Sequence, residues 1–463
     1  MGEGSTLFQS VFLLKKELVA QTITITGLIN GSPRVERSAM FSFDEMPMPS
    51  LGLGGLEADL TEEERAIQDV AHRFAKDVMR PIGQQLDAMT AAQVIAPDSP
   101  LWSYFQQLKD SGILDLETMM AMDYEQKARI IPLIFEELGW GDSGLAVCAL
   151  ATSFPAFAAM ASGDEQLIAQ FGSRLGCWIA TQPDRGSDLV DVECEEIYPG
   201  SRQSKPNLQA KIQGDEVIVN GQSSAWVTGA PLAETALAYI PCDYGEGIYN
   251  AEGGLHQIAI LIDLNDPDVS KGKPLDKLGQ RPLPQGEVFF DEVKVPIKNV
   301  LAQGDKAVGS FHGAITFGNM EMGFTFTGVA RAAFEHALAY VHERKQGGTE
   351  IINHQSVRLR LFDLWRKVEA ARAMAHRVAS YNYSSHGPHL LASVTSKTFV
   401  TRAAYEVASE ALLLFGGNGL TKEYPIEKIV RDAQAALIED GENNILSLKG
   451  ADWLSKWYKA NKL

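Results

Sequence analysis

The stretch between Pro296 and Pro425 contains a single proline, Pro388. Because proline interrupts helices, its scarcity permits long helices here. Alanine and leucine also recur at helical spacing in three runs. These runs are Phe324–Gln346, His354–Tyr383 and Leu390–Phe415. Long helices with one wide apolar stripe pack as antiparallel bundles, so we predict a helical bundle in residues 303–463.

Helical periodicity also dominates residues 57–175. Thr61 and Glu64 form the sequence pattern of a capping box, and apolar residues then recur at helical spacing as far as Val78. Further helix-like runs follow at Leu101–Ser111, Glu125–Leu138, Gly144–Ala161 and Glu165–Phe171. We therefore predict an all-helical domain over residues 57–175.

Strand-like patterns replace the helical ones from Cys177 onward. The strand-like runs are Val217–Val219, Leu237–Ile240, Ile258–Ile262 and Val288–Phe290. Asn220-Gly221, directly after the first run, is typical of a hairpin turn. We predict a β domain over residues 176–302. Residues 1–56, with one strand-like run at Gln21–Ile29, are predicted to be an N-terminal extension.

Composition limits the kinds of partner. The 463 residues carry a net charge of −18 and no cluster of lysine and arginine, so we expect no nucleic-acid partner. The four cysteines and nine histidines show no zinc-binding spacing, so we predict no metal. We expect no membrane-spanning helix, because no apolar run reaches the ~18 residues that such a helix needs. Scattered cysteines fit a reducing compartment, either bacterial cytoplasm or mitochondrial matrix, with cytoplasm favoured.

A glycine-rich turn and a pair of carboxylates suggest chemistry near the C-terminus. Gly416-Gly417-Asn418-Gly419 can bring backbone close to a ligand. A helix-compatible run, Pro425–Ile438, then leads to Glu439-Asp440-Gly441 and to a further helix-like run from Asn443. A carboxylate between two helices can point into a cleft while nearby N–H groups stay open to a ligand. The alternative interpretation is a helix cap.

Three other motifs each have a functional and a purely structural interpretation, and a fourth, Lys277–Arg281, has only a structural one. Thr181–Asp188 could bind an anion or a polar ring, or form a surface loop. Trp226 and Thr228 could stack on a ring and bond its edge, or Trp226 could lie in the core. Lys277–Arg281 reads as a β-bend. Arg344 could hold a phosphate, or complement the end of a helix.

Taken in order, these motifs resemble the acyl-CoA dehydrogenase family. The matching blocks are TQPDRGSD, AWVT, KLGQR…FFDEVKVP, ERKQ…HQ and GGNG…KEYPIEKIVRDA…EDG, within residues 57–463. The resemblance implies an α+β fold with an N-terminal helical domain, a central β-barrel-like domain and a C-terminal four-helix bundle. It also implies FAD, an acyl-CoA substrate, α,β-dehydrogenation, and an electron-transfer flavoprotein or similar acceptor. A homotetramer or homodimer, or an assembly with a sister subunit, is expected.

The resemblance also assigns roles to residues. Asp440 lies where the family's catalytic glutamate usually lies, and Glu439 is the alternative base if the loop is rotated. Ser187, Asp440 and Gly441 are implied to bind substrate. The implied FAD-binding residues are Trp226, Thr228, Gly186, Ser187, Arg344, Gln355, Gly416, Gly417, Gly419 and Glu442. Of these, Arg344 and the glycine-rich turn would reach the FAD of a neighbouring subunit.

The chain departs from the family pattern at several positions. Asp440 is one methylene, about 1.5 Å, shorter than glutamate, which favours a cyclic or bulky acyl group. Leu413 replaces a common glutamine and Gly347 a common phenylalanine, both in the adenine half of the FAD site. Gly318-Asn319 replaces the usual Glu-Arg, which we expect before the first long helix of the bundle. The alternative function is therefore a non-catalytic or altered-chemistry subunit that completes a partner's FAD site.

Overall fold

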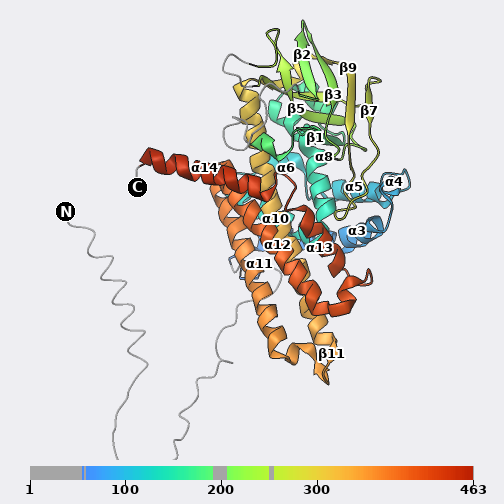
Figure 1. Cartoon of the computed structure of the whole chain (residues 1–463), viewed down its shortest axis with the longest axis vertical. Helices are drawn as coiled ribbons and strands as arrows, with labels where there is room; N and C mark the ends of the chain where they lie inside the picture. The colour runs from blue at the N-terminus through green and yellow to red at the C-terminus, as the bar shows by residue number, and fades with distance from the viewer. Residues whose placement is uncertain (1–54, 57–58, 191–205, 250–254, 462–463) are drawn as a thin grey trace, which may run out of the picture. The chain divides into compact units, whose positions relative to one another are not determined.

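The computed structural model describes residues 55–56, 59–190, 206–249 and 255–461 (Figure 1). Residues 59–463 form one compact unit, and residues 1–58 form a separate one. The strand predicted at Gln21–Ile29 lies outside the described residues. The domain boundaries proposed at residues 56, 175 and 302 remain predictions.

Helices make up the chain from residue 62 to residue 171. The predicted capping box is confirmed: the Thr61 hydroxyl accepts a bond from the Glu64 N–H, and the Glu64 carboxylate accepts one from the Thr61 N–H. The helices are α2 (Glu62–Phe74), the π-helical turn η2 (Ala75–Met79), α3 (Arg80–Asp87), α4 (Ala91–Val94), α5 (Pro100–Ser111), α6 (Leu116–Ala121), α7 (Tyr124–Gly141), α8 (Ser143–Ser162) and α9 (Glu165–Phe171).

Helix α8 corrects one expectation. By length and composition alone, α8 could cross a membrane. This differs from the prediction that no apolar run is long enough. Most of α8 is buried inside the protein, including Leu145, Cys148 and Phe154. The apolar character of α8 is therefore that of a core helix, because it packs against α7, α9 and strand β1 (Gly176–Ile179).

The strands between residues 176 and 303 form a mixed sheet. Its order is β10-β6-β5-β2-β3-β9-β7, and β1 pairs in parallel with β5. The strands are β2 (Gln209–Gln213), β3 (Glu216–Gln222), β5 (Thr235–Asp243), β6 (Gln257–Asp263), β7 (Val269–Lys271), β9 (Val288–Pro296) and β10 (Val300–Gln303). A separate short ladder joins β4 (Val227–Thr228) to β8 (Gln285–Gly286).

The predicted hairpin turn at Asn220-Gly221 is wrong. Both residues lie inside β3, and the β2–β3 hairpin turns instead at Gly214, whose φ is +60°. Gly221, with φ of +107°, lies at an irregularity in the pairing with β9, where a Cβ would lie 1.9 Å from the Asn207 carbonyl oxygen. The Asn-Gly pair therefore supplies a bulge and a close approach rather than a turn.

The C-terminal part is helical, as predicted. Helix α10 starts at Asp305 and continues to Glu343, so it begins well before the predicted Phe324. It packs against α12, α11 and α7. Of these, α11 and α12 are seen beside it in Figure 1. The remaining elements are β11 (Lys345–Gln346), β12 (Thr349–Glu350), η5 (Ile351–Asn353), α11 (Gln355–Asn382), α12 (Leu390–Phe415), η6 (Gly416–Leu420), α13 (Ile426–Ala435) and α14 (Asn443–Asn461).

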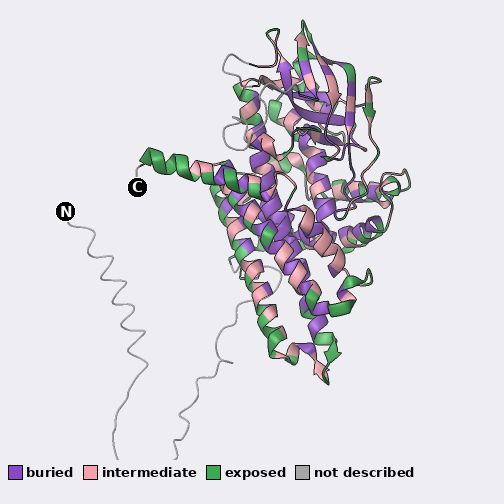
Figure 2. Cartoon of the chain, in the orientation of Figure 1, coloured by how far each residue is buried: buried purple, intermediate pink, exposed green. Residues whose placement is uncertain are grey.

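Buried residues lie on the sides of these helices that face one another, whereas the C-terminal half of α14 is exposed (Figure 2). One buried apolar cluster joins the N-terminal helices to α10 through Leu138 and Phe324, and another fills the inside of the sheet. Because α10 takes part in the first cluster and also contacts β6 and β10, it links all three parts of the compact unit.

Candidate active site

The loop Glu439-Asp440-Gly441 connects α13 to α14. Asp440 has φ of +50° and Gly441 has φ of +97°. A left-handed conformation is unusual for a residue with a side chain, although aspartate tolerates it better than most. The reversal leaves the Asp440 carboxylate next to α10, where a Cβ at Gly318 would lie 3.7 Å from its Oδ2. Gly318 therefore leaves open space beside this carboxylate.

Contacts from distant segments hold the loop. Asn319 Nδ2 donates to the Asp440 carbonyl oxygen at 3.0 Å, and Ser187 Oγ accepts from the Glu442 N–H at 2.9 Å. Lys397 Nζ donates to the Gly441 carbonyl oxygen at 2.7 Å and to Asn443 Oδ1 at 2.8 Å. The loop conformation is therefore set by α10, α12 and the Ser187 segment together.

Burial changes the protonation of this cluster. It raises the pKa of the Asp440 carboxyl above its ordinary value, and the Lys397 ammonium opposes that shift. Lys397 itself is fully buried, and burial lowers its pKa to about 8, while Asp440 attracts the ammonium form. The site thus places a carboxylate of increased basicity beside a buried cation.

Glu439 faces different neighbours from Asp440. Burial and the adjacent Asp440 charge raise the pKa of Glu439 to about 7, whereas the Lys277 ammonium favours its ionised form. Glu439 Oε2 is buried and has no hydrogen-bond partner among the described residues, and the same is true of both side-chain polar atoms of Gln280. These buried polar atoms next to the loop could bond a ligand.

Trp226 and Thr228 form an open edge nearby in the β part. The Trp226 side chain is 63% exposed, which rules out the core interpretation of this tryptophan. Thr228 lies opposite Gln285 in the β4–β8 ladder, and its Oγ1 accepts a bond from Gln285 Nε2 at 3.1 Å. An exposed indole beside a hydroxyl can stack on a planar ring and bond its edge.

Gly186 and Ser187 lie at the start of a short 3-10 turn, η3 (Ser187–Val190). The bond from the Glu442 N–H to Ser187 Oγ joins this predicted segment to the Asp440 loop. The Gly186 N–H donates to Asp188 Oδ1 at 2.6 Å, and a Cβ at Gly186 would meet nothing within 4 Å. Backbone at Gly186 is therefore open to close approach by a ligand.

The other predicted FAD-binding residues gather at the far end of the bundle. Arg344 is exposed and follows the last residue of α10, and Gln355 is exposed at the start of α11. Asn418 Nδ2 donates to the Tyr340 hydroxyl at 3.0 Å, which holds the turn containing Gly416, Gly417 and Gly419 against the last turns of α10. Twenty-five helical residues, or about 37 Å, separate Arg344 from Asn319. One chain therefore does not bring the two groups together.

Glu442 has a structural partner of its own. Its Oε2 accepts bonds from the N–H groups of Asn444 and Ile445, at 2.9 and 3.1 Å. These residues form the first turn of α14, so the carboxylate caps that helix. The helix-cap interpretation thus applies to Glu442 rather than to Asp440, and a cofactor role for Glu442 remains a prediction.

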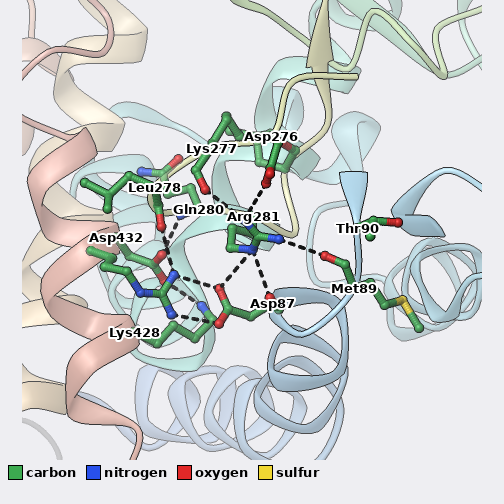
Figure 3. A network of polar contacts seen from close by, with 12 residues as sticks. Asp87, Met89, Thr90, Asp276, Lys277, Leu278, Gln280, Arg281, Lys428 and Asp432 are labelled. Carbon is green, nitrogen blue, oxygen red and sulfur yellow. Dashed lines mark hydrogen bonds and ion pairs between the residues drawn. The ribbon is translucent and has the colours of Figure 1, made fainter. Parts of the chain in front are cut away.

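A polar network between the Lys277–Arg281 segment and α13 was not predicted (Figure 3). The Gln280 N–H donates to Asp432 Oδ1, Lys428 bridges Asp142 and Asp432, and Arg281 donates to the Asp87 carbonyl oxygen. A Cβ at Gly279 would lie 2.1 Å from the Arg431 carbonyl oxygen. Lys277–Arg281 therefore bends at Leu278-Gly279, as predicted, and also holds α13. The sequence did carry a signal for this contact, because the KLGQR block and the KIVRDA block both occur among the motifs that match the family.

Comparisons with known proteins point to the family that the sequence motifs resemble. Residues 309–454 match the family described as acyl-CoA dehydrogenase, C-terminal domain. The chain is 26% identical over 407 residues to the probable acyl-CoA dehydrogenase YngJ of Bacillus subtilis (strain 168), covering 86% of this chain and 99% of that protein. It is 28% identical over 404 residues to benzylmalonyl-CoA dehydrogenase of Aromatoleum aromaticum, covering 85% and 98%.

A solved structure of a glutaryl-CoA dehydrogenase from Mycobacterium smegmatis in complex with FADH2 has the same fold. Its TM-score is 0.70 at 21% identity, with 86% of this chain and 95% of that chain covered. Residues 309–454 thus match the acyl-CoA dehydrogenase family, and relatives that are similar over about 85% of this chain are named acyl-CoA dehydrogenases or acyl-CoA-type dehydrogenases. The chain is therefore an oxidoreductase of that family's type, with the predicted α+β fold.

The three departures from the acyl-CoA dehydrogenase pattern can now be located. Gly318-Asn319 lies inside α10 rather than before it, and it faces Asp440. Leu413 is 58% exposed on α12. Gly347 has φ of +67° in the β11–β12 turn, where an added Cβ would lie 3.3 Å from the His354 ring. Two of these departures therefore lie at the far end of the bundle, and one lies on α10 beside the Asp440 loop.

Sequence reasoning missed Asn319 as a contact of the loop, and it missed Lys397 and Gln285 altogether. Lys397 left a signal, because it is a lysine within the apolar stripe of a long helix. Its side chain is fully buried, which is rare for lysine unless it is paired. Gln285 left no comparable signal, since its partners are Lys277 and Thr228, which lie in other segments.

Proposed function

We propose that the chain is a FAD-dependent acyl-CoA dehydrogenase in which Asp440 removes the α-proton of an acyl thioester. The observation that carries the proposal is the position of Asp440: a carboxylate with a raised pKa, in a left-handed turn, facing the open side of Gly318. Bound FAD would accept the β-hydrogen as hydride, and an electron-transfer flavoprotein or similar protein would then reoxidise it.

The base works only if the developing charge on the thioester is stabilised. An α-proton is weakly acidic, so hydrogen bonds to the thioester carbonyl are needed to stabilise the enolate-like charge. The Asp440 backbone N–H meets no acceptor among the described residues and could supply one such bond. Burial by bound substrate would raise the pKa of the carboxylate further and bring it closer to that of the α-proton.

The residues fit a flavin. Trp226 offers an exposed ring surface, Thr228 offers a hydroxyl, and the buried polar atoms of Gln280 and Glu439 lack partners among the described residues. Trp226, Thr228, Gly186 and Ser187 would hold the flavin half. In a homotetramer or homodimer, Arg344, Gln355 and the glycine-rich turn would hold the adenine half of a neighbour's FAD.

We further propose that the acyl group is cyclic or branched. Aspartate reaches about 1.5 Å less far than glutamate. The α-carbon of the acyl group must therefore lie closer to Asp440, or a bulkier acyl group must raise it towards Asp440. The open space at Gly318 supports this, as does the similarity to an enzyme named benzylmalonyl-CoA dehydrogenase. A misplacement of about 1 Å can cost on the order of 10²-fold in rate.

Anaerobic bleaching of the flavin across an acyl-CoA panel tests both proposals. The panel holds cyclohexanecarboxyl-CoA, a branched thioester and a straight-chain series, each tried with the natural protein and with Asp440→Glu. We expect rings or branches to be preferred, and Asp440→Glu to shift the preference towards straight chains. A straight-chain preference that Asp440→Glu leaves unchanged would refute the reach argument, and no bleaching at all would refute dehydrogenation.

The alternative function is a subunit that completes a partner's FAD site. The exposed Leu413 and the Gly347 turn favour it, because both departures fall in the half of the site that would serve a neighbour. The purified protein discriminates the two functions. A flavin absorption band near ~450 nm, a property of the cofactor, supports the dehydrogenase. Colourless protein that gains the band only with a sister subunit supports the alternative.

A further inference from the structure

A cavity of about 150 Å³ lies between α3, α7, α10 and α13. A cavity of that size holds a molecule such as benzene. None of the residues assigned above to FAD or to the acyl thioester lines it. His336, on its wall, follows Asn319 by 17 residues along α10, which corresponds to about 25 Å. The cavity is therefore a different site from the Asp440 loop.

Arg80 brings a positive charge to this cavity. Its guanidinium stacks over the Trp140 ring, 3.2 Å from the ring centre, and Nε and Nη2 donate to the Trp140 carbonyl oxygen. Nη1 has no hydrogen-bond partner among the described residues, and Arg80 makes no ion pair with them. Glu335 attracts the guanidinium, but Glu335 Oε2 accepts from Trp140 Nε1 and its Oε1 lies 3.5 Å from Arg331 Nε. Burial lowers the pKa of Arg80 to about 10, because the cation leaves water without a bonded counter-charge.

Two further hydrogen-bonding side chains on the cavity wall are unused. His336 makes no hydrogen bond within the part of the chain that the structure describes, and burial together with Arg80 lowers its pKa to about 4. The ring is therefore neutral at pH 7 and offers one donor and one acceptor. Ser143 is 2% exposed, and its Oγ has no partner among the described residues. Because Arg80 can only donate, the three groups together favour a ligand rich in acceptors.

The acidic side chains on the wall already have partners. Lys428 Nζ donates to Asp142 Oδ2 at 2.6 Å and to Asp432 Oδ2 at 2.5 Å. Asp142 Oδ1 also accepts from the Leu145 N–H, and Asp432 Oδ1 accepts from the Gln280 N–H. Apolar side chains complete the wall, namely Val329, Ala332, Pro425 and Ile429. The cavity thus combines one cation that lacks a carboxylate partner with an apolar surface.

We propose that this cavity binds a small monocarboxylate with a compact apolar body, about the size of benzoate. The carboxylate would accept from the free N–H groups of Arg80, and charge-assisted bonds of this kind are strong. The apolar body would cover the apolar part of the wall, which an inorganic anion would leave bare. A neutral ring would leave the guanidinium unpaired. The proposal is independent of the dehydrogenase function, because neither flavin nor acyl thioester takes part in it.

Isothermal titration calorimetry of the purified protein with sodium benzoate tests the proposal. We expect a Kd on the order of 0.1–1 mM, the range for so small a ligand. Benzyl alcohol keeps the ring without the charge, and inorganic phosphate keeps the charge without the ring. Each should therefore bind at least about 10-fold more weakly than benzoate. No binding of benzoate, or equal binding of either comparison compound, would overturn the proposal.

Arg80→Met is the decisive variant, because methionine removes the charge but can still cover the Trp140 ring. It should weaken benzoate binding by about 10- to 100-fold, the size of a hydrogen bond to a charged group. Arg65→Met, at an exposed position on α2, is the matched control and should leave the Kd of benzoate unchanged. An unchanged Kd in Arg80→Met would contradict the inference.

Ala332→Leu replaces that variant if Arg80→Met does not fold. Ala332 lies on the cavity wall and is 3% exposed, so the larger side chain takes up space that benzoate needs. We expect Ala332→Leu to abolish benzoate binding. Benzoate binding of natural strength in folded Ala332→Leu would place the ligand elsewhere and refute the proposal.

Flavin absorbance shows whether benzoate has entered the candidate active site instead. No residue of the Trp226–Thr228 edge lines the cavity, so bound benzoate should leave the flavin band of FAD-containing protein unchanged. A flavin band that shifts with the same Kd as the calorimetric signal would overturn the proposal. Protein that holds no flavin would refute the proposed function alone, because the titration and the variants still decide whether the cavity binds benzoate.

Discussion

The middle of α10 and its C-terminal end lie beside two parts of the candidate site that are built in opposite ways. Beside Asn319, buried contacts from three segments hold the loop containing Asp440, and the partners all come from the same chain. At the C-terminal end, Arg344 and the glycine-rich turn are largely exposed. The difference teaches that contacts within this chain suffice to hold the Asp440 loop, whereas the residues predicted to bind FAD at the far end are left exposed.

Asp440→Asn should have the largest effect at the catalytic end. Asparagine keeps the size but cannot take the α-proton, so flavin reduction by a good acyl-CoA should slow by about 10²- to 10⁴-fold while FAD stays bound. Stopped-flow bleaching measures this, and Glu439→Gln is the matched control with a much smaller loss. The opposite ranking would assign the base to Glu439.

Lys397→Met should weaken the same end through stability. Methionine leaves the Gly441 carbonyl oxygen and Asn443 Oδ1 without their lysine donor in a buried place. We expect a loss of about 2–4 kcal/mol in the free energy of unfolding, measured by denaturant titration. The exposed Lys422→Met should change it by less than about 0.5 kcal/mol. Equal effects would show that Lys397 does not brace the loop.

Arg344→Ala tests the far end. If Arg344 holds the FAD pyrophosphate of a neighbour, its loss should weaken FAD binding by about 10- to 100-fold without changing the melting temperature of the flavin-free protein. Arg402→Ala, another exposed arginine, serves as the control. Light scattering completes the test, because a monomer that holds FAD tightly would contradict a site shared between subunits.

Glu439→Gln should give the smallest effect, visible in the pH dependence of stability. The pKa of Glu439 is about 7 in the folded protein and 4.5 ordinarily, so the folded state holds the proton more tightly. Stability from this group is therefore present at low pH and is lost as pH rises from about 4.5 to about 7.

Glu439→Gln should remove that loss. It should raise the free energy of unfolding relative to the natural protein by about 1–3 kcal/mol at pH 7.5, and by little at pH 4.5. Thermal melts across this range measure the difference. A difference that stays constant with pH would show that Glu439 titrates normally.

The sequence by itself determined the order of helical and strand segments and the family. Local spacing predicted the long helices because one apolar face repeats along each of them, and the ends of α11 and α12 lie within one residue of the prediction. Ordered motifs also located Asp440, Trp226 and Thr228, since each block is continuous in sequence.

Only the tertiary structure decided which distant residues meet. Asn220-Gly221 has the composition of a hairpin turn, yet pairing with β9 and the close approach of Asn207 place it inside β3. Lys397 and Asn319 contact the Asp440 loop, and Gln285 joins Lys277 to Thr228, across gaps in sequence that no local pattern records. The physical reason is that a buried hydrogen bond depends on how helices and strands pack, and packing joins residues irrespective of their distance along the chain.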